Sequence, residues 1–249
     1  MASGVRVEVC VESVESAIAS QQGGAHRVEL CANLLEGGTT PSAGAIAAAR
    51  KALGIALHVI VRPRGSDFCY SDVEFDVMRR DVAAAKELGA DGVVIGLLRE
   101  DGRVDAERTR ELAALARPIS VSFHRAFDMC RDPHEALETL IQLGIDRVLT
   151  TGQEDSIWDG MELVAELVRR AGDRIIVMPG GGRDGNVKAI VERTGAREVH
   201  VVGTRAVESR MRFRNDRCFM GGALRSPEYS WAVTDPQRIQ AIVDAVGRE

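Results

Sequence analysis

The chain has 249 residues, of which 45% are hydrophobic and 28% charged, and its formal net charge is -5. This composition can fill a large core, and the acidic balance argues against a protein that binds nucleic acid or anionic membranes over a broad basic surface. The first residues lack the basic and then apolar pattern of a secretory signal, and no later run reaches the roughly 18 apolar residues of a membrane span. We therefore expect a cytoplasmic protein whose partners are small ligands or other proteins.

Five cysteines are spread along the chain, which is an odd number in a large protein without a secretion signal. A disulfide framework is not expected, because such frameworks belong mainly to small secreted domains. We expect free thiols, several of them serving as small buried hydrophobes: Cys10, Cys31, Cys69, Cys130 and Cys218.

Short runs rich in β-branched residues alternate with Ala- and Leu-rich stretches of helical periodicity. The predicted strands cover residues 5–11, 27–31, 55–61, 92–97, 119–123, 147–151, 174–178 and 198–202, and the clearest helices cover 14–22, 72–88, 133–143 and 157–170. An open doubly wound sheet would show the same alternation, but eight units without a compositional break favour closure. We predict one α/β domain over 1–249, a (β/α)8 TIM-type barrel with a rim loop at 62–71 and a C-terminal elaboration at 204–249.

Alternate side chains of barrel strands point to the helices and to the lumen. One set is uniformly apolar and is expected to face the helices: Val7, Val9, Val28, Leu30, Val59, Val61, Val121, Phe123, Val199 and Val201. The other set predicts an unusually polar lumen: Glu8, Cys10, Glu29, Cys31, His58, Arg62, Ser122, His124, Thr150 and His200. Buried charges must pair with one another or with a ligand, so the lumen is either an internal salt-bridge network or a binding site.

Two cysteines occupy equivalent places, in Val-Glu-Val-Cys10 on the first predicted strand and in Val-Glu-Leu-Cys31 on the second. Neighbouring parallel strands would bring both thiols to a similar height near the carboxyl rim of the barrel. Soft thiolates suit Cu(I), whereas a closed zinc site needs four ligands. The alternative is that both are small core residues, with Glu8 and Glu29 paired to Arg62 or Arg125.

The rim loop after the third strand is dense in polar residues. Arg62 and Arg64 can hold a carboxylate or phosphate in forked geometry, and Asp67 can orient one of them. A loop held by its own ion pairs is an equal alternative. The helix that follows is expected to begin with a cap at Ser71 or Asp72.

After the fifth strand, His124, Arg125 and Asp128 fall within one turn of the rim. His124 is a candidate acid or base at neutral pH, with Asp128 or Glu29 setting its tautomer. A histidine of this kind is more often a satisfied core residue, but here it has charged neighbours on the expected functional face.

Glycines follow the seventh and eighth strands, where barrels often hold a phosphate on backbone N–H groups. Gly180, Gly181, Gly182 and Gly203 are therefore candidates for anion binding, with a tight turn as the alternative.

Several motifs together resemble the CutC family, called copper homeostasis proteins, over nearly the whole chain: VEVCVESVESA, GGAHRVELCANLLEGGTTPS, RPRGSDFCYSD, FHRAFDM, RVLTTGQ, MPGGGR, EVH and MRFRND. The resemblance implies a (β/α) barrel, a cytoplasmic location, homo-oligomerisation and Cu(I) binding. Cys10 and Cys31 are the positions that match the family's proposed copper thiols.

Two functions compete on these observations. The first is Cu(I) binding through the paired thiols of Cys10 and Cys31 at the barrel rim. The second is an enzyme that acts by acid and base chemistry on a small phosphorylated or carboxylate metabolite. In the second, the proton-transfer groups are drawn from Glu8, Glu29, His124 and Asp128, and the anion is held by Arg62, Arg64 and Arg125.

Overall fold

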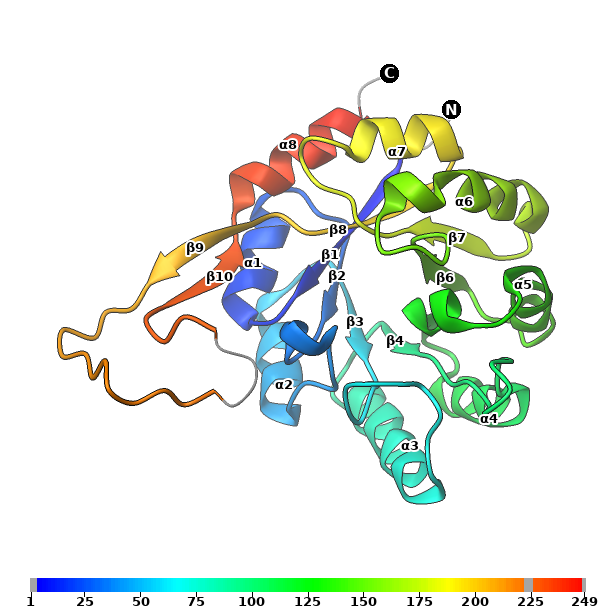
Figure 1. The fold of residues 1–249 in the computed structure, drawn as a ribbon, viewed down its shortest axis with the longest axis horizontal. Coiled ribbons are helices and arrows are strands. Elements are labelled where there is room, and N and C mark those ends of the chain that lie inside the picture. Colours follow the sequence, from blue (N-terminus) through cyan, green and yellow to red (C-terminus); the bar gives the residue numbers. More distant parts are fainter. Residues whose placement is uncertain (1–3, 222–225, 248–249) are drawn as a thin grey trace.

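Eight parallel strands form a nearly closed barrel in the computed structural model, which describes residues 4–221 and 226–247 (Figure 1). The strand order is β7-β6-β5-β4-β3-β2-β1-β8. The seam between the last two strands is bridged by Gly182, which pairs in parallel with Val201, donates its N–H to His200 O at 3.2 Å and accepts the Val202 N–H at 3.0 Å. The predicted TIM-type barrel is confirmed.

The elements alternate as the sequence predicts. The barrel strands are β1 (Arg6–Val11), β2 (Arg27–Leu30), β3 (Ala56–Ile60), β4 (Gly92–Ile95), β5 (Ser120–Phe123), β6 (Arg147–Thr150), β7 (Ile176–Pro179) and β8 (Glu198–Val201). The helices are α1 (Val14–Gln22), α2 (Ala43–Ala52), α3 (Asp72–Glu87), α4 (Ala106–Ala116), α5 (Pro133–Gln142), α6 (Ile157–Ala171), α7 (Val187–Thr194) and α8 (Pro236–Gly247). Two 3-10 turns, η1 (Leu34–Glu36) and η2 (Arg125–Met129), and the strands β9 (Thr204–Glu208) and β10 (Ser230–Thr234) complete the fold.

Six of the eight helices that the structure describes begin after a residue whose side chain accepts a free backbone N–H group of the first turn. The Ser71 hydroxyl accepts the Glu74 N–H at the start of α3, and the Glu74 carboxylate accepts the Ser71 N–H in return. The sequence predicts a cap at Ser71 or Asp72, and the structure shows it at Ser71, with the reciprocal contact of Glu74 in addition. Side-chain caps of the same kind open other helices, at Ser13, Ser42, Asp105, Asp132 and Ser156.

The core lies between the strands and the helices. All ten residues predicted to face the helices are fully enclosed in one hydrophobic cluster. One assignment to the lumen is wrong: Thr150 lies on the same side of β6 as Val148, which is in the core, whereas Leu149 lines the lumen. The error is a shift of one residue on β6, which exchanges the two faces of a strand.

Two glycines, one in β4 and one just after it, make room inside the lumen. A Cβ on Gly92 would lie 2.5 Å from the His58 ring, and a Cβ on Gly96, just beyond the strand, would lie 2.3 Å from the His124 ring. The absence of a side chain at Gly92 and at Gly96 therefore leaves room for the two imidazole rings.

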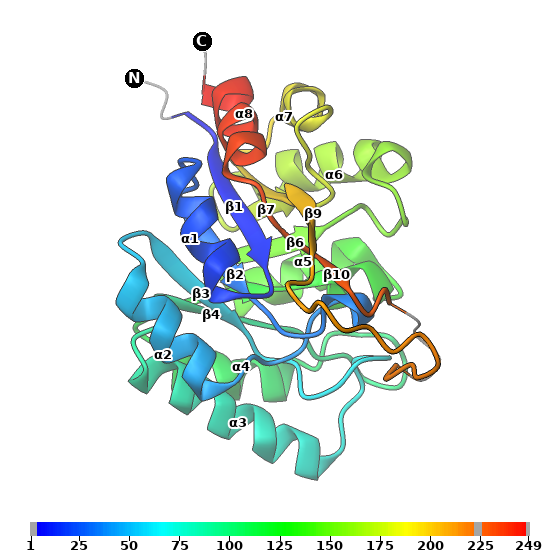
Figure 2. The same ribbon diagram turned by 90° about the vertical axis from the view of Figure 1, so that its left-hand side faces the viewer.

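The C-terminal segment has two parts, not one elaboration. β9 and β10 form an antiparallel hairpin that projects from the barrel (Figures 1 and 2). The segment after it returns as α8, which lies between α1 and α7 and buries Ile239 and Ile242 completely. α8 therefore serves as the eighth helix of the barrel, and the hairpin is an insertion before it.

Candidate functional site

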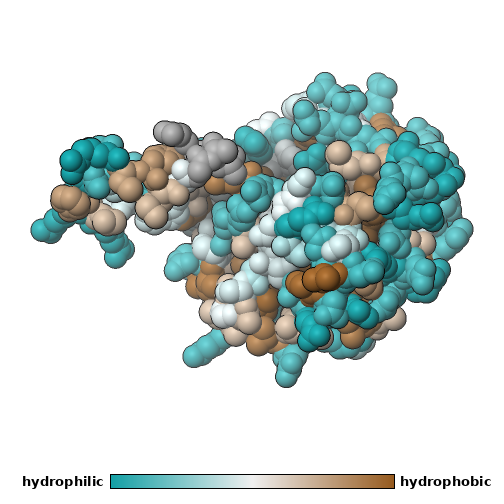
Figure 3. All heavy atoms as spheres, turned by 60° about the horizontal axis from the view of Figure 1, so that its bottom comes forward, coloured by the Kyte–Doolittle hydropathy of each residue, from teal (hydrophilic) through white to brown (hydrophobic). Residues whose placement is uncertain are grey.

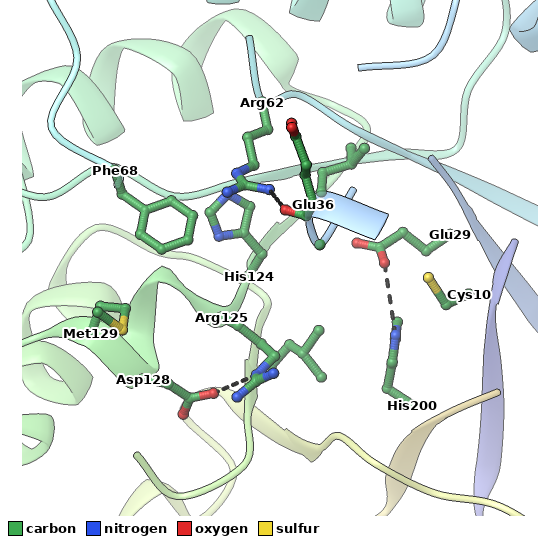
Figure 4. A pocket seen from close by; sticks show the side chains of 13 residues that line it. Cys10, Glu29, Glu36, Arg62, Phe68, His124, Arg125, Asp128, Met129 and His200 are labelled. Atoms are coloured by element: carbon green, nitrogen blue, oxygen red, sulfur yellow. Dashed lines mark hydrogen bonds and ion pairs between the residues drawn. The ribbon is translucent and has the colours of Figure 1, made fainter. Parts of the chain in front are cut away.

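A pocket of about 290 Å³ opens at the carboxyl ends of the strands, where barrels of this type carry their functional residues (Figure 4). Its wall combines charged, thiol and apolar side chains: Cys10, Glu29, Glu36, Gly37, Ile60, Arg62, Phe68, His124, Arg125, Asp128, Met129, Leu149 and His200. They come from the strands β1, β2, β3, β6 and β8, from the turns η1 and η2, and from the connecting rim segments.

The two predicted thiols meet on one side of this pocket. Cys10 Sγ lies 3.9 Å from Cys31 Sγ. The reason is the pairing of β1 with β2, which aligns Cys10 with Glu29, while the Cys31 N–H donates to Val11 O at 2.9 Å. Cys10 lines the pocket, whereas Cys31 is buried beneath it. The predicted proximity of the two thiols is confirmed.

His200 and Glu29 join the thiols. One ligand atom from each of Cys10, Glu29 and His200 lies within 4.8 Å of the others. The His200 Nε2 atom is 3.8 Å from Glu29 Oε2 (Figure 4). His200 belongs to the residues predicted to face the lumen, but not to the predicted site residues. The signal for including it in the site is the Glu-Val-His motif, in which Glu198 and His200 alternate with Val199 and so face the lumen together.

A network of buried ion pairs lies beneath this cluster. Glu8 Oε1 is 2.8 Å from His200 Nδ1, and the other Glu8 oxygen pairs with Arg27. Arg27 also pairs with Glu198 at 2.5 Å, and Glu198 pairs with Arg147 at 2.8 Å. The alternative expectation that Glu8 pairs with Arg62 or Arg125 is wrong, because Arg27 and His200 are its partners.

These contacts set the protonation states at neutral pH. Burial opposes ionisation of Glu8, but Arg27 and His200 hold its pKa well below the usual range. Burial also opposes the charged form of His200, yet its hydrogen bonds to Cys10 and Glu8 raise its pKa well above normal. The hydrogen bond from Cys31, with a further contribution from His200, lowers the pKa of Cys10 to about 5, although burial acts in the opposite direction.

The remaining members of the cluster are neutral. The hydrogen bond that the Cys31 thiol donates to Cys10, and to a lesser extent its burial, raise the pKa of Cys31 well above its usual value. Burial raises the pKa of Glu29 to about 8. At neutral pH the cluster therefore holds a Cys10 thiolate beside a His200 imidazolium, with Cys31 and Glu29 protonated.

His124 lies on the other side of the pocket and behaves differently from the prediction. Its Nδ1 accepts the Ala126 N–H at 3.0 Å, so this backbone group, and not Asp128 or Glu29, fixes its tautomer. Burial and the nearby Arg62 lower the pKa of His124 to about 3. The ring is therefore neutral at physiological pH, with its proton on Nε2.

Asp128 holds Arg125 instead. An Asp128 oxygen lies 2.7 Å from Arg125 Nε, and Thr151 Oγ1 accepts from Arg125 Nη2 at 2.7 Å. Asp128 also accepts hydrogen bonds from Thr150, Thr151 and Gln153. Its carboxylate is thus fully engaged, and it positions a guanidinium at the mouth of the pocket.

The two arginines of the rim loop have different places. Arg62 is buried in the pocket wall and donates to the carbonyl oxygens of Glu36, Gly38 and Ser66. Arg64 points away from the pocket and pairs with Glu74 at 2.5 Å and with Asp67 at 2.9 Å. The two arginines therefore do not form one clamp, and Arg64 and Asp67 belong to the alternative in which the loop holds itself.

The glycine loops also lie apart from the pocket wall. The N–H groups of Gly180 and Gly182 are donated to Thr150 O and His200 O, as in strand pairing. Gly203 packs against α8, where a Cβ would lie 2.7 Å from Ile239 Cδ1, and Gly181 sits at a turn with φ of +78°. The tight turn that the sequence left as the alternative accounts for Gly181, whereas strand pairing and packing against α8 account for the other three.

Fold and site together define a class of protein, a (β/α)8 barrel with a cluster of thiols, imidazole and carboxyl groups in a pocket at the carboxyl ends of its strands. A model of the CutC family matches residues 5–205. The chain belongs to this family, whose members are named for copper homeostasis.

Known relatives match over almost their full lengths. The copper homeostasis protein cutC homologs of Mus musculus and Homo sapiens are 49% and 48% identical to this chain, covering 96% and 97% of it and 89% of each relative. A family protein CutC of Chromobacterium violaceum is 50% identical, over 97% of this chain and 98% of its own.

Solved structures agree with the fold. The crystal structure of a CutC copper homeostasis protein from Streptococcus agalactiae superposes with a TM-score of 0.75 at 34% identity, covering 79% of this chain and 97% of that one. Phosphoribosylanthranilate isomerase of Thermotoga maritima superposes with a TM-score of 0.56 at 14% identity, over 97% and 98% of the two chains. The second likeness concerns the fold alone.

Proposed function

We propose that the chain binds Cu(I) between the thiols of Cys10 and Cys31, with His200 as a third ligand. The observation that carries this proposal is the 3.9 Å separation of the two Sγ atoms, of which the Cys10 Sγ also lies within 4.8 Å of a His200 ring nitrogen. Two sulfurs and an imidazole are soft or borderline ligands, and thiolates favour Cu(I) over hard cations. Glu29 offers a hard oxygen and is protonated near neutral pH, so it suits the metal less well.

The proton states support entry of a soft cation. Cys10 is already a thiolate, whereas Cys31 must release its proton and His200 must become neutral when the metal binds. Copper binding is therefore accompanied by proton release. The pocket gives access, since Cys10 and His200 line it.

The test is a competition titration with Cu(I) under anaerobic, reducing conditions. We expect one tightly bound copper per chain, lost in Cys10→Ser and in Cys31→Ser. Cys218→Ser is the matched control, because this exposed thiol lies on the hairpin insertion. His200→Gln is expected to weaken binding by about tenfold or more. Equal copper affinity in the wild type and both thiol variants would remove this function.

The enzyme hypothesis has one observation in its favour. The pocket volume of about 290 Å³ is far larger than a metal ion requires. Its proton-transfer roles have less support at two residues. Arg27 holds Glu8 in the ionised form. His124 has a pKa of about 3 and is therefore a weak base at neutral pH. What remains of this hypothesis is the binding of a small molecule beside Glu29, whose place in the pocket wall and pKa of about 8 suit proton transfer near neutral pH.

We infer that the chain also self-associates through the hairpin. This insertion carries exposed apolar side chains beside arginines, seen as brown and teal atoms on the projection in Figure 3. Met211, Phe213 and Trp231 are 61%, 76% and 53% exposed. A two-stranded ribbon is marginal alone in water, so a second copy of the chain is the partner that would cover it.

Light scattering after size exclusion tests this inference. Phe213→Ser with Trp231→Ser is expected to shift an oligomer to the monomer mass. Trp158→Ser, an exposed tryptophan on the barrel body, is the control. A monomeric wild type, or an unchanged mass in the double variant, would contradict it.

No helix among residues 4–221 and 226–247 is long and apolar enough to cross a membrane. A site built on two reduced thiols needs a reducing compartment, and this supports the cytoplasm as the location we propose.

A further inference from the structure

The pocket has two chemically different sides. Figure 4 shows Cys10, Glu29 and His200 on one side, and Arg62, His124 and Arg125 on the other. Copper would occupy the first side only. The second side has features that point to a separate ligand.

Arg62 is a buried cation with uncharged partners. Its side chain is 5% exposed, and its guanidinium donates to three backbone carbonyls and lies 5.0 Å from the centre of the Phe68 ring. None of these partners carries a negative charge. Buried charges are normally paired, so this arrangement favours an anion nearby.

Donors without acceptors lie in the same wall. Within the part of the chain that the structure describes, His124 Nε2 is a buried atom without a hydrogen-bond partner, and so is Arg62 Nε, although the Tyr70 hydroxyl interacts with the Arg62 side chain. The His124 Nε2 atom carries the proton, because Nδ1 accepts the Ala126 N–H. A buried donor without an acceptor is unfavourable, and a ligand with acceptor oxygens would supply the missing partner.

Arg125 supplies an accessible cation at the same place. Its side chain is 48% exposed, and Asp128 and Thr151 hold it in position. Asp128 accepts from Thr150, Thr151 and Gln153 as well, so its charge is already dispersed over several donors. A guanidinium held rigidly at the edge of a cavity is suited to forked binding of a carboxylate or phosphate.

We propose that this side of the pocket binds a small organic oxyanion, a carboxylate or a phosphate ester, whose charged group lies between Arg62 and Arg125 with His124 as a neutral donor. The volume of about 290 Å³ is near the lower end of the roughly 300–1,000 Å³ typical of small-molecule sites. The Phe68 ring and Met129 supply apolar contact for its carbon skeleton. The uncharged end of the ligand then faces Cys10 and His200.

Calorimetric titration of the metal-free protein with inorganic phosphate and, separately, with succinate tests the proposal. We expect at least one of the two probes to bind once per chain with a Kd below about 10 mM. Binding of phosphate alone assigns a phosphate ligand, and binding of succinate alone assigns a carboxylate. Failure of both probes to bind would overturn the proposal.

Arg125 variants locate the site. Arg125→Gln is expected to lower the affinity for the bound probe at least tenfold, and Arg125→Lys is expected to retain part of this affinity. Arg131→Gln is the matched control, since Arg131 is 43% exposed, pairs with Glu135 and does not line the pocket. Equal affinities in Arg125→Gln and Arg131→Gln, with both variants folded by circular dichroism, would contradict the assignment.

The same titration in Cys10→Ser separates this proposal from copper binding. The oxyanion should still bind when the copper site is lost, because its charge is held on the opposite side of the pocket. Loss of probe binding in Cys10→Ser would overturn the placement between the two arginines.

Discussion

Glu8 Oε1 lies 2.8 Å from His200 Nδ1, which links the first strand of the barrel to the last. The pairing of β1 with β8 places these two residues in register. Because Glu8 is ionised, Nδ1 carries the proton shared with it, and Nε2 faces Cys10 and Glu29. A carboxylate that orients a histidine in this way is a recurring support for metal ligands.

Glu8→Gln is therefore expected to lower Cu(I) affinity by about 10- to 100-fold without removing a proposed ligand. Glu192→Gln on α7, an exposed carboxylate near Lys188, is the control. Loss of the pair with Arg27 will also lower the stability, so the titration is made well below the melting temperature of the variant. Unchanged copper affinity in folded Glu8→Gln would show that His200 is oriented by other means, or does not bind the metal.

The Cys10 thiol is expected to react with iodoacetamide at lower pH than Cys31 or Cys130. Its pKa is lowered to about 5, chiefly by the hydrogen bond from Cys31, whereas burial raises the pKa of Cys130 to about 12. Since the thiolate is the reactive form, alkylation of Cys10 in the metal-free protein should already be near its plateau at pH 6.5. Peptide mapping by mass spectrometry measures the extent of alkylation of each cysteine over pH 4–9. A Cys10 profile that rises only above pH 8 would contradict the assigned ion pair.

His124 is expected to make the protein sensitive to acid. The pKa of His124 is about 3 in the folded protein, below the usual 6.5. Between these two pH values the unfolded chain therefore binds a proton at this histidine, and the folded chain does not. Stability is therefore lost as the pH falls below 6.5, by about 2–3 kcal/mol at pH 4.5 for this group. His124→Gln should lower the stability at pH 7 but lose less of it between pH 6.5 and 4.5.

Urea denaturation at a series of pH values gives the comparison. His134→Gln is the control, because that histidine is partly exposed on α5. Parallel pH profiles for the wild type and His124→Gln would contradict a buried neutral imidazole.

Gly96→Ala is expected to destabilise the protein by about 1–3 kcal/mol, because the new methyl group would lie 2.3 Å from the His124 ring. The displaced ring should also weaken the oxyanion site. Gly185→Ala is the control, since a Cβ there has nothing within 4 Å. Equal unfolding free energies for the two variants would mean that His124 can move aside without cost.

The strand faces and the neighbouring thiols of the barrel were predicted from patterns local in the sequence. The apolar alternation of Val7 and Val9 predicted which face of β1 meets the helices, and the matched positions of Cys10 and Cys31 predicted two neighbouring thiols. These predictions succeeded because period-two alternation and the pairing of consecutive parallel strands depend on residues close in the sequence.

The partners of the charged side chains were decided by the tertiary structure alone. The sequence predicts that Arg64 binds an anion together with Arg62 and Arg125, but in the structure Arg64 pairs with Glu74. The partners of Glu8 are Arg27 and His200. Glu8 and His200 are 192 residues apart, and they meet only because the barrel closes β1 onto β8. Sequence alone determined which residues face the lumen in most strands, because that follows from each strand's own alternation. Closure determined which of them touch, because contact across the lumen depends on the stagger of all eight strands.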